Sequence, residues 1–219
     1  MLKHRKAVAE KKTIQRDFSR KNGVKSTALD VVPKSTEPKV IMGVDPGTNF
    51  TGYGIITVQG KEVRCEAIGY IDMVKMTDTY QKLRHIFERV SGIIEAYKPN
   101  EVAFESPFYG ENVQSMLKLG RAQGVAMAAA LTKGLPVFEY APRKVKAAIT
   151  GNGAASKEQV ASLLCSLLKI KQLPKNLDST DGLAVAMCHY YESLSFKSVG
   201  GGAKSWSEFA AKNAKRIKE

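Results

Sequence analysis

Short strand-like segments come first in the hydrophobic pattern of the chain. Residues 40–44 form an apolar run typical of a strand that is buried on both faces of a sheet. Asp45 ends this run, turn residues 46–48 follow it, and residues 51–58 form a second β-rich run. A third run, of mixed polarity, covers residues 62–71. The short connections predict a meander of three antiparallel strands.

Helical periodicity begins after this meander. In residues 77–97 the apolar side chains recur at spacings of three and four, as in an amphipathic helix. A fourth strand over residues 101–104 leads into Glu105. A second long helix is predicted over residues 112–133, and a short fifth strand over 137–140. The fold class is therefore predicted as α/β, with a five-stranded mixed sheet flanked by helices.

The remaining segments are also predicted to be helical. Pro142 begins one helix, and the glycine-containing residues 150–153 break it. Ser156 is a suitable cap for a helix over residues 157–168. The last informative segment, residues 176–191, is a helix with apolar residues following two aspartates.

The charge of the chain is concentrated at its ends. The 219 residues carry a formal net charge of +13, and residues 1–39 hold 11 Lys and Arg against four Asp and Glu. We predict a basic leader over 1–39, one catalytic-sized domain over 40–194 and a basic tail over 195–219. Basic ends around a nearly neutral body suit contact with a polyanion, although solvated ends explain the same composition.

Cysteine content and hydropathy indicate the compartment. Cys65, Cys165 and Cys188 are odd in number and not closely spaced, which is typical of free thiols in a reducing environment. No apolar run approaches the roughly 18 residues of a membrane span, and the first residues lack a secretory signal pattern. We therefore expect a cytoplasmic protein.

Four carboxylates are the candidates for chemistry. Asp45 and Glu105 each end a short apolar strand, and neighbouring strands of an α/β sheet gather their sites at their carboxyl ends. Asp178 and Asp181 are three residues apart, so they share one helix face. Close carboxylates repel one another unless protons or cations occupy the cluster. Mg²⁺ suits such oxygen ligands, and two ions about 3.5–4 Å apart can promote phosphodiester hydrolysis.

Simpler explanations exist for the individual motifs. The Asp-Pro-Gly-Thr segment is a turn on one interpretation. On another, Gly47 and Thr48 present backbone N–H groups to a phosphate, as in actin-like ATPases and sugar kinases. Asp178 could be a helix cap, with Asp181 in the first turn where the helix dipole favours it. That interpretation does not explain the two acids at strand ends.

Basic and aromatic residues near these acids are candidates for nucleic-acid contacts. Lys146 and Lys157 flank the glycine break and could clamp a phosphate, or they could be ordinary surface charges. Phe108 and Tyr109 follow the fourth strand and could stack on unpaired bases or pack under the next helix. We interpret His189 as a half-buried helix histidine rather than a ligand.

Five motifs in residues 40 to about 194 resemble one family. They are GVDPGTNFTGYG, FESPFYGEN, LKLGRAQGVA, VFEYAPRKVKAAITGNGAASKEQV and DSTDGLAVAMCH. In order and spacing they are similar to the RuvC-type crossover junction endodeoxyribonucleases, which are bacterial Holliday junction resolvases with a ribonuclease H-like fold. The resemblance implies a homodimer that binds four-way DNA junctions and nicks two opposed strands symmetrically. The products are 5′-phosphate ends that a ligase can seal in DNA recombination and repair.

The resemblance also implies roles for single residues. The metal-binding catalytic acids are Asp45, Glu105, Asp178 and Asp181. Lys146 and Lys157 would contact DNA near the scissile phosphate, and Phe108 would stack at the exchange point of the junction. The implied cofactor is Mg²⁺, two ions per subunit, which Mn²⁺ can replace. The implied partner is a branch-migration complex of a junction-binding tetramer and a hexameric ATPase motor.

Two features depart from the family pattern. The leader over 1–39 is long for a family that starts close to its first strand, and Arg121 and Gln123 exchange the expected polar and basic positions.

Two other classes of protein are less well supported. An actin-like ATPase or sugar kinase needs a second phosphate loop and usually a second lobe, and a non-catalytic junction-binding module does not need four acids.

Overall fold

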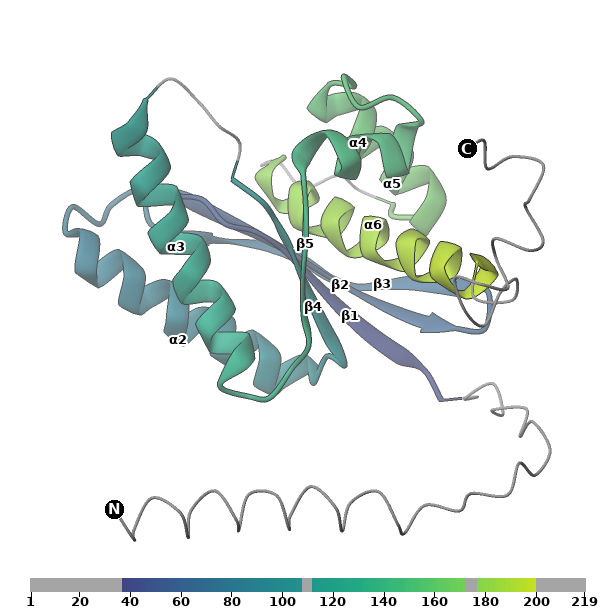
Figure 1. Ribbon diagram of the computed structural model, residues 1–219, viewed down its shortest axis with the longest axis horizontal. Coiled ribbons are helices and arrows are strands. Elements are labelled where there is room, and N and C mark those ends of the chain that lie inside the picture. Colours follow the sequence, from purple (N-terminus) through teal and green to yellow (C-terminus); the bar gives the residue numbers. More distant parts are fainter. Residues whose placement is uncertain (1–36, 108–111, 172–176, 200–219) are drawn as a thin grey trace, which may run out of the picture. The chain divides into compact units, whose positions relative to one another are not determined.

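A five-stranded mixed sheet forms the centre of the computed structural model, which describes residues 37–107, 112–171 and 177–199. The strand order is β3-β2-β1-β4-β5 (Figure 1). The strands are β1 (Lys39–Asp45), β2 (Phe50–Gln59), β3 (Glu62–Asp72), β4 (Glu101–Glu105) and β5 (Val137–Tyr140). β1, β2 and β3 form an antiparallel meander, whereas β4 is parallel to β1 and β5 is parallel to β4. The predicted meander and the predicted mixed sheet are both confirmed.

Helices cover both faces of this sheet. They are α2 (Thr79–Tyr97), α3 (Val113–Leu131), α4 (Pro142–Thr150), α5 (Lys157–Leu168) and α6 (Asp178–Val199). Figure 1 shows α2 and α3 on one face, and α4, α5 and α6 on the other. The side chains of β1 alternate between two hydrophobic cores, because Met42 and Val44 join the core with α2 and α3 while Ile41 joins the core with α6. A strand covered on both faces explains the continuous apolar run in the sequence.

Helix starts agree with the capping signals. The Ser156 hydroxyl accepts from the backbone N–H of Gln159, and the Gln159 side chain accepts from the backbone N–H of Ser156, which completes a capping box. The predicted cap at Ser156 is thus confirmed. The helix expected from residue 77 begins later, at Thr79, because the Asp78 side chain caps it by accepting from the Gln81 N–H.

The predicted domain limits fall near the limits of the described residues. β1 begins at Lys39, one residue before the expected start, and α6 continues past 194 to Val199. The rest of the predicted leader and tail lies outside the described residues, so their character stays a prediction. The three cysteines are free thiols, as expected. Among the described residues, no helix is both long and apolar enough to cross a membrane.

Glycines allow α6 to pack directly on the backbone of β1 and β2. A Cβ atom added to Gly43 would overlap the Gly182 carbonyl oxygen, and one added to Gly52 would overlap that of Asp178. From the helix side, a Cβ atom on Gly182 would lie 2.5 Å from the Tyr53 Cα. The missing side chains thus let the helix approach the sheet more closely than an ordinary residue would permit. This contact fixes the first turn of α6 beside the end of β1.

We predict that Gly43→Ala lowers the free energy of unfolding by about 3 kcal/mol, because rigid backbone surrounds the added methyl group. Gly92→Ala is the matched control. Gly92 lies in α2 with no atom within 4 Å of an added Cβ, so alanine should raise the free energy of unfolding by about 0.5–1 kcal/mol. Urea unfolding measures both variants. Equal effects would show that the close helix contact is not required.

Candidate active site

Two of the predicted acids lie side by side at the ends of neighbouring strands. In the parallel pair of β1 and β4, Val44 pairs with Phe104, so the next residues along the two strands are Asp45 and Glu105. Both strands end there, which places the two carboxylates at the same edge of the sheet. The predicted convergence of these two strand ends is confirmed. They line a cavity of about 150 Å³ together with Pro107.

The other two acids come from the start of α6. Asp178 and Asp181 lie in its first turn, and the Asp178 carbonyl packs on Gly52. Gly52 is the cross-strand partner of Asp45, so the close helix contact carries this turn to the end of β1. Segments far apart in the sequence therefore meet at one edge of the sheet.

Burial and mutual repulsion dominate the electrostatics of this cluster. Burial, followed by the charge of Asp181, raises the pKa of Asp45 to about 7. Burial, followed by the charges of Asp45 and Asp181, raises the pKa of Glu105 to about 8. Burial also raises the pKa of Asp181, although Lys157 opposes that shift. The carboxylates thus lie close enough to disfavour one another's ionisation, and positive charge is needed to keep them all ionised.

Lys157 supplies part of that positive charge. Its Nζ lies 2.6 Å from Asp181 Oδ2 and 3.1 Å from Asp178 Oδ1. Burial alone would lower the pKa of Lys157, but the bonds to the two aspartates raise it overall. Lys146, on α4, also lowers the pKa of both Glu105 and Asp181, so its charge acts on the same cluster.

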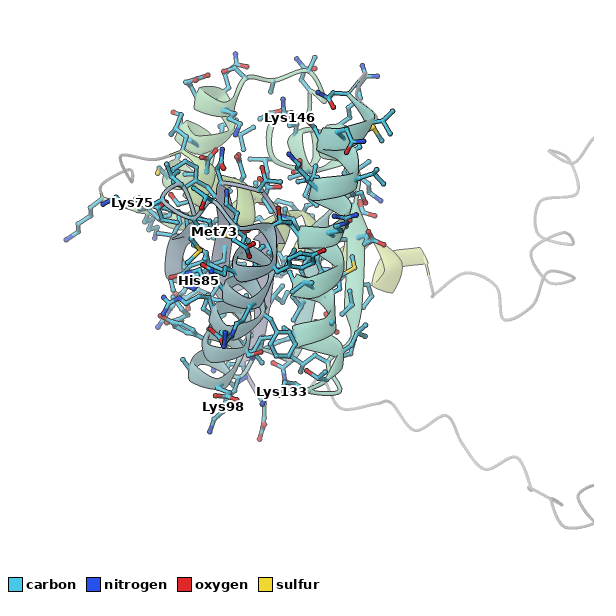
Figure 2. The ribbon with its side chains drawn as sticks, turned by 90° about the vertical axis from the view of Figure 1, so that its left-hand side faces the viewer. Met73, Lys75, His85, Lys98, Lys133 and Lys146 are labelled. Atoms are coloured by element: carbon cyan, nitrogen blue, oxygen red, sulfur yellow. The ribbon has the colours of Figure 1, made fainter. Side chains whose placement is uncertain are left out.

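Figure 2 places Lys146 at the opposite end of the molecule from Lys98 and Lys133. The end with Lys146 carries the acid cluster, since Lys146 acts on Glu105. The two lysines that sequence reasoning selected thus adjoin the acids. The exposed Lys157 side chain bonds to two of these carboxylates.

The donor set determines which metal ions fit the site. In the part of the chain that the structure describes, no group of three or more His, Cys, Asp or Glu side chains is arranged to hold a metal ion. The Lys157 ammonium lies between Asp178 and Asp181. Four carboxylates nevertheless offer only hard oxygen ligands, which suit Mg²⁺ or Mn²⁺. An ion bound by both aspartates would have to displace this ammonium.

Gln123 is a site residue that sequence reasoning did not identify. It is 7% exposed, lines the same cavity as Asp45 and Glu105, and comes from α3. Its Nε2 donates to the Glu105 carbonyl oxygen at 3.3 Å and to Glu139 Oε1 at 2.7 Å. The exchanged order of Arg121 and Gln123 in the sequence could have pointed to Gln123. With this order Arg121 is exposed, and the Gln123 amide is buried against the sheet.

Two other predictions have different outcomes. Phe108 and Tyr109 lie outside the described residues, so their predicted stacking stays untested. His189 was expected to be half-buried, but it is 3% exposed and fully hydrogen-bonded. Its Nδ1 lies 2.7 Å from the Tyr140 hydroxyl and its Nε2 lies 2.6 Å from Glu101 Oε2. These bonds join α6 to β4 and β5, which is a structural role.

Comparison with known proteins gives consistent matches. The family model described as crossover junction endodeoxyribonuclease RuvC matches residues 41–189. The protein of that name from Cytophaga hutchinsonii is 51% identical over 186 residues, covering 85% of this chain and 91% of the relative. The corresponding protein from Bacteroides fragilis is 53% identical over 182 residues, covering 82% of this chain and 96% of the relative.

Solved structures support the same assignment. The Thermus thermophilus RuvC structure is 30% identical with a TM-score of 0.64, covering 70% of this chain and 95% of that chain. T. thermophilus RuvC in complex with Holliday junction substrate is 30% identical with a TM-score of 0.66, covering 71% of this chain and 94% of that chain. The predicted ribonuclease H-like fold is confirmed by these similarities. In sequence and in fold, the chain belongs to the crossover junction endodeoxyribonuclease RuvC family.

Proposed function

We propose that the protein is a structure-selective endonuclease that resolves Holliday junctions by nicking two opposed DNA strands symmetrically, in recombination and repair. The observation that carries this proposal is the convergence of Asp45, Glu105 and the Asp178/Asp181 pair at one edge of the sheet. Relatives of about 50% identity are named for this activity, and the T. thermophilus protein binds a Holliday junction substrate.

The proposed cofactor is a pair of Mg²⁺ ions, which Mn²⁺ can replace. The residues that would hold them are Asp45, Glu105, Asp178 and Asp181. When bound, such ions activate water and stabilise the leaving oxygen of a phosphodiester. The protein contributes the position of its carboxylates: two are attached to strand ends, and two are fixed by the helix contact with Gly52 and Gly43. This rigidity limits the reorganisation needed before reaction.

Lys157 and Lys146 are proposed to contact the DNA near the scissile phosphate. An ammonium released from Asp178 and Asp181 is a strong donor for phosphate oxygens. Lys146 acts electrostatically on Glu105, so it lies where a phosphate beside the acids would meet it. Phe108 follows Glu105 by three residues, and we propose that it stacks on a base at the exchange point.

The proposed assembly is a homodimer. Symmetric nicking of two strands requires two equivalent active sites, which a two-fold dimer supplies. A face of α3 is suited to such a contact, because Val113 and Leu117 are 65% and 52% exposed and an added Cβ on Gly120 or Gly124 would meet nothing within 4 Å. In the cell, we propose that the dimer works in the cytoplasm with a branch-migration complex of a junction-binding tetramer and a hexameric ATPase motor.

Incubation with Mg²⁺ and a labelled synthetic four-way junction tests the proposed activity. We expect paired nicks in opposed strands from the unchanged protein. Asp45→Asn should abolish cleavage while junction affinity stays equal or rises, because a negative charge near the phosphate is lost. Glu95→Gln is the control, since this exposed acid pairs with Lys133 at the far end of the molecule. Undiminished nicking by Asp45→Asn, or ATP turnover in place of nicking, would reject the proposal.

The metal-free protein should lose stability as the pH rises. The folded-state pKa values of Asp45 and Glu105 are raised to about 7 and about 8, so the folded protein retains protons that the unfolded chain releases near pH 4. Linkage then lowers the free energy of unfolding between about pH 4 and pH 8. Asp45→Asn should therefore be stabilising, increasingly so toward about pH 8, with a melting temperature raised by about 2–4 °C per kcal/mol.

Thermal unfolding in chelator at a series of pH values measures this difference. Glu95→Gln should show a constant offset from the unchanged protein above about pH 5, because the pKa of Glu95 is lowered rather than raised. A stability difference for Asp45→Asn that shrinks as the pH rises would contradict the proposed charge cluster.

Gln123 is expected to position Glu105. We predict that Gln123→Leu slows single-turnover cleavage by about tenfold to a hundredfold and raises the Mg²⁺ concentration needed for half-maximal cleavage. The matched control is Gln114→Leu on the exposed side of the same helix, which should leave both quantities unchanged. If Gln123→Leu lowers only the melting temperature, the residue contributes to packing and not to the site.

A further inference from the structure

A second, larger cavity lies beside the acid cluster. Its volume is about 330 Å³, and it is bordered by the turn after β1, the start of α2 and the first half of α3. Its polar lining residues are Thr48, Asn49, Thr77, Thr79, Lys82, Ser115 and Lys118. Among the described residues no Asp or Glu lines it. The lining therefore offers hydroxyl and amide groups with two ammonium groups, which is a composition suited to an anion.

The positive charges of this cavity are not neutralised by carboxylates. Lys82 Nζ donates to the Thr48 carbonyl oxygen and to Asn49 Oδ1, each at 3.0 Å, and both partners are neutral. Lys118 is exposed and forms no ion pair with any residue that the structure describes. The nearby Asp78 carboxylate accepts from the Gln81 N–H at 2.7 Å, so it serves as a helix cap.

The cavity adjoins the candidate active site through two elements. Thr48 lies three residues after Asp45, on the same turn. On α3, Lys118 lines this cavity, while its neighbours Leu119 and Gln123 line the cavity of the acids. The two cavities thus adjoin through the turn after β1 and one segment of α3, and Figure 2 faces α2 and α3, the two helices that border the larger cavity.

We propose that this cavity is a second DNA-backbone subsite, in which Lys82 and Lys118 bind a phosphodiester group near the scissile one. The proposal rests on the proposed junction-cleaving function. Lysine binds phosphate as a point charge, and the hydroxyl groups of Thr48, Thr77 and Ser115 can donate additional hydrogen bonds. Such a contact positions the DNA strand over the acids without reading its sequence.

Salt dependence of binding tests this subsite directly. Each phosphate neutralised by the protein contributes about 0.9 to the slope of log K against log salt on duplex DNA. We expect Lys118→Gln, and separately Lys82→Gln, to reduce the slope for a labelled four-way junction by about 0.9.

All variants are made in the Asp45→Asn background of the full chain, so that cleavage does not disturb the measurement. Lys118→Gln is the primary variant, because Lys118 is exposed and its replacement leaves the fold intact.

Lys98→Asn is the matched control for charge. Lys98 lies at the end of the molecule opposite Lys146 (Figure 2), in a left-handed helix cap that asparagine tolerates, so this variant loses one charge away from the site. Its slope should equal that of the parent. If Lys118→Gln and Lys82→Gln also keep the parental slope, the proposal is wrong.

Two further arms separate the possible explanations. Inorganic phosphate at millimolar concentration is added to the DNA-free protein, and its effect on the melting temperature is measured. Stabilisation lost in Lys118→Gln, with an unchanged slope on DNA, would identify a free-phosphate site and overturn the DNA assignment. A parent that cannot bind the junction at all would instead reject the proposed function, because the subsite test compares variants only after the parent has bound.

Discussion

The contact between α6 and the sheet is the constraint on which the site depends. Side chains between a helix and a sheet normally keep the two backbones apart. Gly43, Gly52 and Gly182 have no side chain where α6 packs on β1 and β2, so the backbones approach closely. The backbone of α6 therefore lies on the backbone of β1 and β2, and Asp178 is brought next to the residue opposite Asp45. Without this approach, acids separated by more than half of the domain's sequence would not lie at one edge of the sheet.

Charge is the second constraint, and it acts against the first. Close packing removes water from Asp45 and Glu105, and proximity adds repulsion, so both pKa values rise. Lys157 offsets part of this cost by bonding to Asp178 and Asp181. The same arrangement that disfavours the ionised carboxylates also favours binding of a cation beside them, either an ammonium group or a divalent metal ion. Structure and proposed chemistry are therefore linked through the electrostatics of one cluster.

The sequence predicted those parts of the structure that follow from periodicity. The apolar runs before Asp45 and Glu105 predicted that the two acids share one edge of the sheet if their strands are neighbours, and the pairing of Val44 with Phe104 shows that they are. The spacing of Asp178 and Asp181 required one helix face, and both do bond to one lysine. These inferences needed only the two-residue repeat of a strand and the turn of a helix.

Long side chains and helix rotation were beyond such reasoning. The Lys157 ammonium could have reached solvent or DNA, and its bond to Asp181 depends on how α5 packs against α6. The inward orientation of Gln123 depends on how α3 is rotated on the sheet, which spacing alone does not determine. The burial of His189 was underestimated because α6 is covered nearly all round, so its sequence has no solvent-facing stripe.

The central position of α6 also has a consequence for how the protein is made. During synthesis, β1 leaves the ribosome long before α6 has been made. The sheet face that α6 covers therefore stays exposed until the last helix is complete. The acids of the cluster cannot assemble until this late segment docks. A chain that has not yet released α6 therefore lacks the acid cluster, because Asp178 and Asp181 belong to that helix.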